Sequence, residues 1–108
     1  MPGEAIKGHL DLLLLTLIDS GATHGYALAQ RLRTASDGTF DLADGTIYPA
    51  LRRLSDNDLV TSRWSDDGGR RRRVYSLTAK GRAALRKERA QWEQFERSVQ
   101  AVLKLRPS

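Results

Sequence analysis

Apolar residues recur at helical spacing in the first part of the chain. Between Lys7 and Ile18, four leucines follow the i, i+3, i+4, i+7 pattern of one helical face: Leu10, Leu13, Leu14 and Leu17. Further apolar residues at 12, 15 and 18 widen this stripe, so the predicted helix is apolar on more than one side. A helix of this kind needs two partners, the core of its own domain and a second surface such as that of another protomer.

Turn residues and the same periodicity delimit two further helices. Thr23 is the expected N-cap of a helix over residues 23–34, whose apolar face would consist of Tyr26, Ala27, Leu28 and Leu32. The next helix is expected between residues 44 and 57, with its stripe at Ile47, Ala50, Leu51 and Leu54. A start near Thr46 fits Pro49 better than a start at Asp44, because proline is tolerated in the first turn of a helix.

The pattern then changes from helical spacing to that of two strands. Residues 59–65 and 72–77 are rich in strand-forming side chains and are separated by a turn at Asp66-Asp67-Gly68-Gly69. A last helix runs from Thr78 or Ala79 to Leu103, with Thr78 as its cap. The order α-α-α-β-β-α is that of a winged helix-turn-helix: a mainly α fold with a β-hairpin and a long C-terminal helix. We expect one compact unit, with a DNA-binding part at residues 1–78 and a dimerisation helix at 79–108.

Composition limits the chain to one small domain and places its positive charge unevenly. The protein has 108 residues and a net charge of +5. Nine basic residues and one acidic residue lie between Arg70 and Arg89, whereas acidic residues outnumber basic ones before Arg70. Taken alone, this concentration describes a solvated basic face. Beside the predicted hairpin, it suits an anionic polymer.

Several classes of function find no support in the residues. The chain has no cysteine, so thiol catalysis, disulfides and thiolate metal sites are excluded. His9 and His24 stand at no metal-ligand spacing, and no phosphate-binding or nucleophile motif occurs, so we expect no enzyme, no metal and no cofactor. The four leucines at 12–15 are too few to span a membrane, and no signal peptide precedes them. A cytoplasmic protein with no membrane partner is the expectation.

Four motifs, in register between about Leu10 and Gly81, resemble the PadR family of transcriptional regulators. His24-Gly25-Tyr26 followed by Leu28 resembles the start of that family's second helix. The segment 44–54, DGTIYPALRRL, resembles its recognition-helix signature, and 74–81, VYSLTAKG, is similar to its exit from the wing. The segment 58–60, DLV, resembles the entry to the wing, although Asp58 stands where glycine is more usual. Beyond Gly81 the likeness is only to the architecture of the short family members.

The resemblance implies that the third helix lies in the major groove of duplex DNA. With the apolar stripe facing the core, five side chains are expected to face DNA: Thr46, Tyr48, Pro49, Arg52 and Arg53. The hairpin would add a row of four arginines: Arg70, Arg71, Arg72 and Arg73. Because side chains alternate along a strand, Arg70 and Arg72 should point one way and Arg71 and Arg73 the other. Such a wing can follow the backbone or enter the minor groove.

The last helix carries an incomplete heptad pattern that favours a homodimer. Its a/d positions are Leu85, Trp92, Phe95, Val99 and Val102, and Leu13 of the first helix is expected beside them. A two-fold dimer matches a palindromic operator. By resemblance, the dimer would be a repressor released by an aromatic or drug-like small molecule stacked on Trp92, with Phe95 and Leu14 nearby. Two roles are open for Trp92, ligand stacking or burial in the core.

Two rival functions make different demands on the same fold. A winged-helix protein-interaction module without DNA binding would carry a neutral or acidic wing, whereas this wing has four consecutive arginines. An RNA-binding winged helix would expose aromatic rings for stacking on bases, and residues 70–73 contain none. The residues therefore favour a DNA-binding transcriptional regulator.

Overall fold

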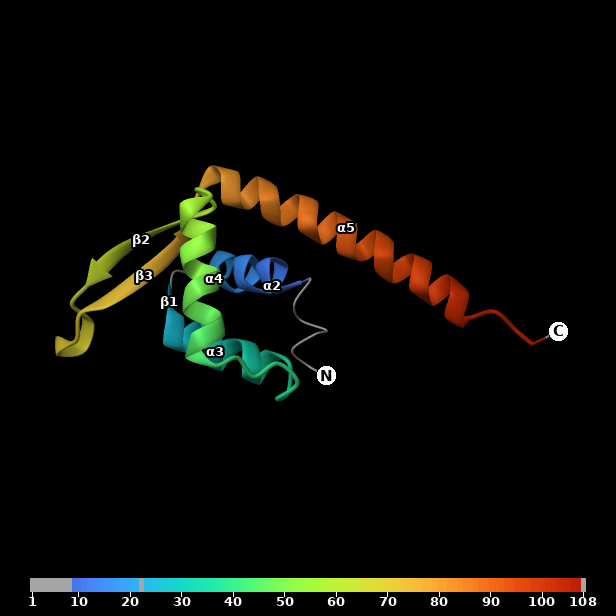
Figure 1. The fold of residues 1–108 in the computed structure, drawn as a ribbon, viewed down its shortest axis with the longest axis horizontal. Coiled ribbons are helices and arrows are strands. Elements are labelled where there is room, and N and C mark those ends of the chain that lie inside the picture. Colours follow the sequence, from blue (N-terminus) through green and yellow to red (C-terminus); the bar gives the residue numbers. More distant parts are fainter. Residues whose placement is uncertain (1–8, 22, 108) are drawn as a thin grey trace.

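The computed structural model describes residues 9–21 and 23–107, and within them the order of elements is that of a winged helix (Figure 1). The helices are α2 (Leu10–Asp19), α3 (Gly25–Ala35), α4 (Asp44–Asp56) and α5 (Ala79–Leu103). The strands are β1 (Thr23–His24), β2 (Val60–Ser65) and β3 (Arg72–Leu77), with a short 3-10 turn at Asp67–Gly69. The predicted fold class is therefore confirmed. The expected helix start at Lys7 lies outside the described residues.

The core lies where α2, α3 and α4 meet the inner face of the sheet. Its fully buried side chains come from all three helices: Leu14, Leu15, Leu28, Ile47, Leu51 and Leu54. The stripe predicted for α4 is buried at all four positions. In α2 the deeply buried residues are Leu14, Leu15 and Ile18, while Leu13 stays half-buried. The helix is thus apolar on two sides, as its pattern predicted.

A third strand precedes α3 and corrects the expected cap of that helix. β1 pairs with β3, so the sheet has the order β1-β3-β2, with Thr23 opposite Tyr75 and Val60 opposite Leu77. Thr23 is therefore a strand residue, and His24 is the N-cap, its Nδ1 accepting a hydrogen bond from the Ala27 N–H at 3.3 Å. Tyr26, expected on the apolar face, is 55% exposed. Two residues between turns are too few to give a strand pattern in the sequence.

Helix α4 begins earlier and ends more tightly than expected. It starts at Asp44, and no side chain caps it. Because of this early start, Pro49 lies inside the helix and lacks the N–H that would bond to the Gly45 carbonyl. At its other end, Leu59 N–H bonds to Leu54 O and Asp58 N–H to Ser55 O, a Schellman motif. Asp58 takes a left-handed φ of 60°, which explains why glycine would suit this position and why a small polar residue is tolerated.

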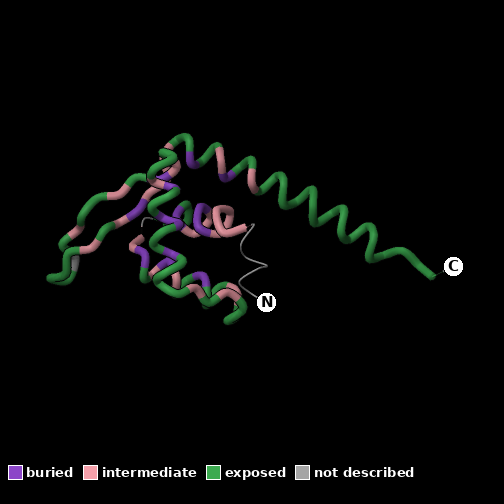
Figure 2. Tube along the Cα trace, in the orientation of Figure 1, coloured by how far each residue is buried: buried purple, intermediate pink, exposed green. Residues whose placement is uncertain are grey.

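Helix α5 starts against the body and then extends away from it. Thr78 caps it as predicted, its Oγ1 accepting a hydrogen bond from Gly81 N–H at 2.9 Å. The first turns pack on the core, and Figure 2 shows the outer half exposed along its length. This helix gives the molecule extents of 65 × 29 × 20 Å. On the other side of the body, the β2–β3 hairpin (residues 60–77, called the wing below) projects in the opposite direction (Figure 1).

Candidate nucleic-acid interface

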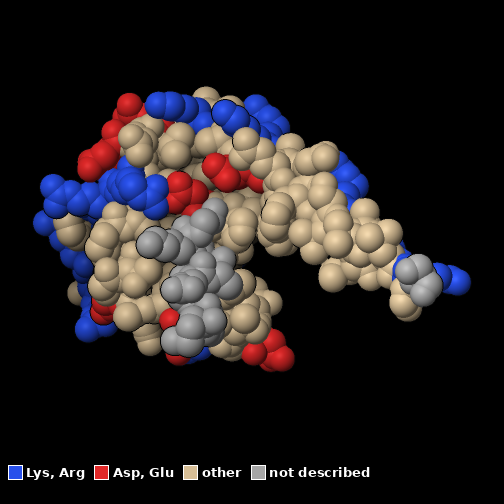
Figure 3. All heavy atoms as spheres, turned by 45° about the vertical axis from the view of Figure 1, so that its right-hand side comes forward, with Lys and Arg blue, Asp and Glu red and all other residues tan. Residues whose placement is uncertain are grey.

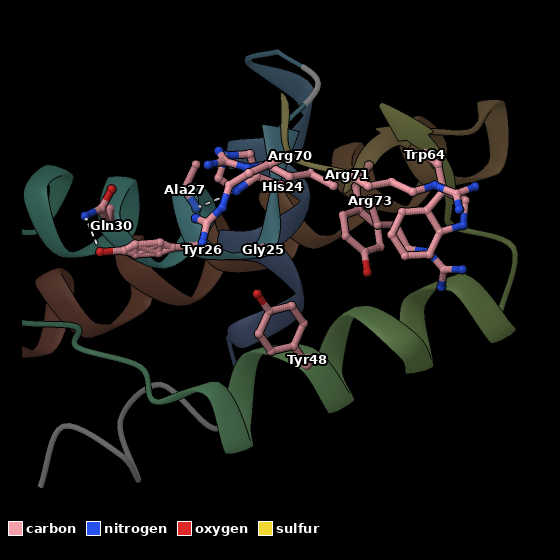
Figure 4. Close-up of a pocket in the computed structure, with 12 residues that line it drawn as sticks. His24, Gly25, Tyr26, Ala27, Gln30, Tyr48, Trp64, Arg70, Arg71 and Arg73 are labelled. Carbon is pink, nitrogen blue, oxygen red and sulfur yellow. Dashed lines mark hydrogen bonds between the residues drawn. The ribbon is translucent and has the colours of Figure 1, made fainter. Parts of the chain in front are cut away.

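A hollow of about 860 Å³ separates the wing from helices α3 and α4 (Figure 4). One wall is the start of α3, the second is Tyr48 on α4, and the third is the wing with Trp64 and the arginines 70–73. A second hollow of about 380 Å³ continues it along α4 and is lined by Arg52, Ser55 and Arg73. The two share Tyr48, Arg73 and Tyr75, so they form one groove whose walls are mainly basic and aromatic, with Asp56 of α4 as an acidic lining residue.

The outer face of α4 presents the side chains that the sequence assigned to it. Thr46, Tyr48, Pro49 and Arg52 are all exposed, because Ile47, Ala50, Leu51 and Leu54 occupy the buried face. Tyr48 lies against Gly25, where an added Cβ would stand only 2.5 Å from the ring carbon Cε1. Glycine at 25 therefore lets the Tyr48 ring lie close to the start of α3, with its hydroxyl directed toward that helix (Figure 4).

Arg53 lies apart from this group and has a partner within the fold. Its two terminal nitrogens donate to the Asp11 carboxylate at 2.9 and 2.6 Å, joining α4 to α2. The hydrogen bond to Asp11 raises the pKa of Arg53 above its usual value, so the guanidinium stays charged. Of the two α4 arginines that were expected to face DNA, Arg52 lines the groove, whereas Arg53 joins α4 to α2.

The arginines of the wing alternate as expected. The guanidinium carbons of Arg71 and Arg73 both lie 4.9 Å from the centre of the Trp64 indole. Trp64 sits directly opposite Arg73 in the β2–β3 register. Arg72 reaches the other way, and its Nη1 lies 2.8 Å from His24 Nε2. All four wing arginines line the groove, and the turn glycines 68 and 69 both take positive φ to close the hairpin.

His24 connects the wing to the start of α3. Two donors, Ala27 N–H and the Arg72 guanidinium, approach its two ring nitrogens. A neutral imidazole has only one acceptor nitrogen, so it can accept from one of these donors at a time. With Nδ1 accepting from Ala27 N–H, the ring turns Nε2 toward the Arg72 guanidinium, so Arg72 lies where the wing meets the start of α3.

Tyr75 closes the floor of the groove. The residue is only 7% exposed, and its burial raises the pKa of Tyr75 above the usual range, against the opposing effect of Arg73. The phenol is therefore neutral at ordinary pH and available as a hydrogen-bond donor.

Figure 3 shows Lys and Arg gathered at the wing end of the molecule and along the outer edge of α5, while much of the opposite side of α5 carries no charge.

The apolar face of α5 is largely exposed in the single chain. Trp92 is 36% exposed and Phe95 57%, and Val99 and Val102 follow on the same face. Trp92 contacts His9 edge to face, with ring centres 5.0 Å apart, and Phe95 at 6.0 Å. Trp92 is thus not a core tryptophan of the protomer.

Two residues expected on functional surfaces lie in the core instead. Leu85, assigned to the dimer seam, is 5% exposed because the first turns of α5 pack against the body. Leu14, assigned to an effector site, has no exposed surface, so it cannot touch a ligand without unpacking α2. Leu13 beside it is half-buried and stays available to a second protomer.

Sequence reasoning missed Trp64 and the contact between His24 and Arg72. Trp64 belongs to the segment 59–65 predicted as a strand, and its place opposite Arg73 in that hairpin is the signal that predicts their contact. Among the described residues, no three His, Asp or Glu side chains come together to hold a metal ion. No helix in that same part of the chain is long and apolar enough to cross a membrane.

Comparison with known proteins agrees with this arrangement. Residues 14–87 match the PadR-like family of transcriptional regulators. The chain is 41% identical over 76 residues to the transcriptional regulator Rv3488 of Mycobacterium tuberculosis, covering 70% of this chain and 68% of that protein. It is 31% identical over 94 residues to the transcriptional regulator YqjI of Escherichia coli, covering 87% of this chain but 44% of that protein. A PadR-like regulator from Bacillus cereus superposes with a TM-score of 0.86 at 27% identity, covering 95% of this chain and 99% of that one.

Proposed function

The chain belongs to the PadR-like family of transcriptional regulators, which are not enzymes, and from this premise we propose that it binds duplex DNA as a homodimer. In this proposal α4 enters the major groove and the wing follows the adjacent backbone or minor groove. The supporting observation is the groove between these two elements. Six of the proposed DNA contacts line the groove: Tyr48, Arg52, Arg70, Arg71, Arg72 and Arg73. Thr46 and Pro49 are exposed on α4 outside the two hollows, and Arg53 pairs with Asp11 of α2.

The chemistry of the groove suits a polyanion with a regular backbone. Arg52 can reach guanine O6 and N7 in a major groove, and Tyr48 and Thr46 can donate to phosphates. The arginines on the wing line the same groove as Tyr48 of α4 and would supply charge without base specificity. A protein-interaction module without DNA binding is the weaker alternative, since four arginines on one exposed hairpin would have to be desolvated against another protein.

Binding to duplex DNA is expected to weaken steeply with salt. A duplex of about 30 base pairs, selected from a random-sequence pool, is titrated by fluorescence anisotropy at several salt concentrations. The logarithm of the affinity should fall linearly with the logarithm of salt, with a slope of about −0.9 per phosphate contacted. An affinity that does not change with salt concentration, or a preference for single-stranded RNA of the same length, would contradict the proposal.

The second part of the proposal is a dimer held by α5. Four exposed apolar side chains follow a/d spacing on the outer half of this helix: Trp92, Phe95, Val99 and Val102. The 25-residue helix is about 37 Å long and its outer turns have no core of their own. A second copy of α5, with Leu13 of α2 beside it, would cover this stripe. In this proposal residues 1–78 form the DNA-binding part and residues 79–108 the dimerisation helix, with Leu13 as a dimer contact from the first part.

Phe95→Glu is expected to convert the dimer to a monomer. The substitution places a charge in the apolar seam of both protomers, where no basic partner would face it. Analytical ultracentrifugation should show the monomer mass, and operator affinity should fall because only one half-site is held. Gln100→Glu is the matched control, since it adds the same charge to the exposed polar side of the same helix. Equal dimerisation of both variants would contradict this seam.

Repression and its release extend the proposal. A dimer that covers two half-sites about 34–36 Å apart excludes other proteins from that stretch of a promoter, which is the basis for proposing a repressor. A flat aromatic effector would stack on Trp92 and Phe95, whose rings are exposed in the protomer, and would change how the two α5 helices meet. Since the DNA of bacteria, the source of the relatives, lies in the cytoplasm, we propose the same location for this protein.

A further inference from the structure

Trp64 is a large exposed aromatic residue near the outer end of β2, a strand that starts at the buried Val60. Its side chain is 52% exposed, and it lies on β2 opposite Arg73. Because side chains alternate along a strand, the residue before it on the same face of β2 is Ser62, and its direct cross-strand neighbour is Arg73, so neither of these neighbours is apolar. What surrounds the indole is cationic, because Arg71 and Arg73 both place their guanidinium carbons 4.9 Å from its centre (Figure 4).

We propose that Trp64 is a positioning residue that holds Arg71 and Arg73 in place for the DNA backbone, and this inference rests on the proposed function. Two guanidinium groups near each other repel, and the negative face of the indole offsets that repulsion. The contact also limits the rotamers of two long side chains before DNA arrives. Less side-chain freedom is then lost on binding, which raises affinity without adding a contact to DNA.

An aromatic ring orients arginine side chains differently from a carboxylate. Among the described residues, ion pairs join Arg33 to Asp41 and Arg53 to Asp11, and neither involves the wing. A carboxylate beside Arg71 or Arg73 would orient the side chain but would compete with phosphate for it. The indole orients both arginines and leaves their charge unneutralised. The wing thus reaches DNA with two ordered positive charges.

Because the indole carries no charge, positioning has a signature that separates it from direct charge contact. Removing a phosphate-contacting arginine lowers the salt slope by about one for each wing on the DNA. Removing the residue that orders those arginines lowers affinity but leaves the number of charges, and therefore the slope, nearly unchanged. If Trp64 had a purely structural role, both Trp64→Phe and Trp64→Ala would instead lower the thermal stability of the hairpin.

The test compares Trp64→Ala, Trp64→Phe and Arg73→Ala in the full-length protein. Trp64→Ala should bind the selected duplex about tenfold more weakly, with a salt slope within about 0.5 of the wild type. Trp64→Phe keeps a π face and should recover most of the affinity, whereas Arg73→Ala should flatten the slope. Thermal melting of each variant, followed by circular dichroism, checks that the wing is folded.

A second measurement detects the contact of Trp64 with Arg71 and Arg73 in the absence of DNA. In ¹H–¹⁵N spectra of the free protein, the Nε–H signals of Arg71 and Arg73 should be shifted upfield by the indole and should move downfield in Trp64→Ala. Unchanged signals, or a Trp64→Ala variant that binds DNA as the wild type does, would overturn the inference while leaving DNA binding intact. Wild-type protein that fails to bind any duplex would overturn the proposed function instead, and the spectra would still report on the contact.

Discussion

Replacing Arg70, Arg71, Arg72 and Arg73 together by alanine is expected to reduce the affinity for duplex DNA at least a hundredfold at about 0.1 M salt. All four side chains line the groove between the wing and α4, and no carboxylate among the described residues pairs with them. In a dimer the change removes these charges from both wings. The slope of log affinity against log salt should therefore become flatter by several units, as measured by anisotropy over a series of salt concentrations.

A matched variant separates position from total charge. Changing Arg86, Lys87, Arg89 and Lys104 to alanine removes the same four positive charges from exposed positions on or beside α5. Long-range attraction falls equally in both variants, so this control should lose only a few-fold in affinity and keep most of its salt slope. Equal losses in the two variants would show that the wing acts only through net charge, and the proposed contact would then be wrong.

The fold was largely predictable because its signals are local. The helical stripes of α4 and the capping threonine of α5 depend on residues within a few positions of each other, and both are found where the sequence placed them. The alternation of the wing arginines followed from strand geometry alone. The order of these elements followed from the same local signals, and the structure confirms it apart from the added β1. The motif resemblance added the family, which the family match confirms.

What sequence reasoning missed depends on contacts between distant residues. β1 exists because Thr23 and His24 pair with β3, about fifty positions away, and two residues carry no periodicity of their own. Arg53 was expected to face DNA, whereas the fold places the Asp11 carboxylate of α2 beside it. Leu85 fitted the heptad pattern as well as Trp92 does, but the body of the domain covers the first turns of α5 and leaves the outer turns bare.

Helix α4 starts at Asp44, the earlier end of the predicted range, and not at the preferred Thr46. A helix start near Thr46 would have kept Pro49 in the first turn, whereas the observed start at Asp44 puts it inside. The missing hydrogen bond affects the Gly45 carbonyl on an exposed part of the helix, where water can replace it. The free-energy cost of the hydrogen bond that Pro49 cannot make, which favoured the later start, is therefore smaller here than in a buried helix.

Gly81→Ala is expected to lower the free energy of unfolding by about 3 kcal/mol. A Cβ at position 81 would stand 1.9 Å from the Leu59 carbonyl oxygen and 2.9 Å from its carbon, and both are backbone atoms. The same carbonyl accepts a hydrogen bond from Thr78 N–H at 3.1 Å, so it cannot turn aside without releasing the cap of α5. Relief therefore requires α5 to move away from the end of α4, which opens the core around Leu85.

Thermal and urea unfolding measure this loss, and a midpoint lower by roughly 10–20 °C is the expected size for a domain of this length. Gly45→Ala is the matched control, because no atom lies within 4 Å of a Cβ there and the residue sits in α4 at an ordinary helical φ. Its stability should stay level or rise by less than about 1 kcal/mol. If Gly81→Ala were as stable as Gly45→Ala, the close approach of α5 to Leu59 would not hold the helix in place. The angle at which α5 leaves the body, and with it the geometry of the proposed dimer, would then have to be set by the packing of α5 on α2, including Leu85 and Ala84.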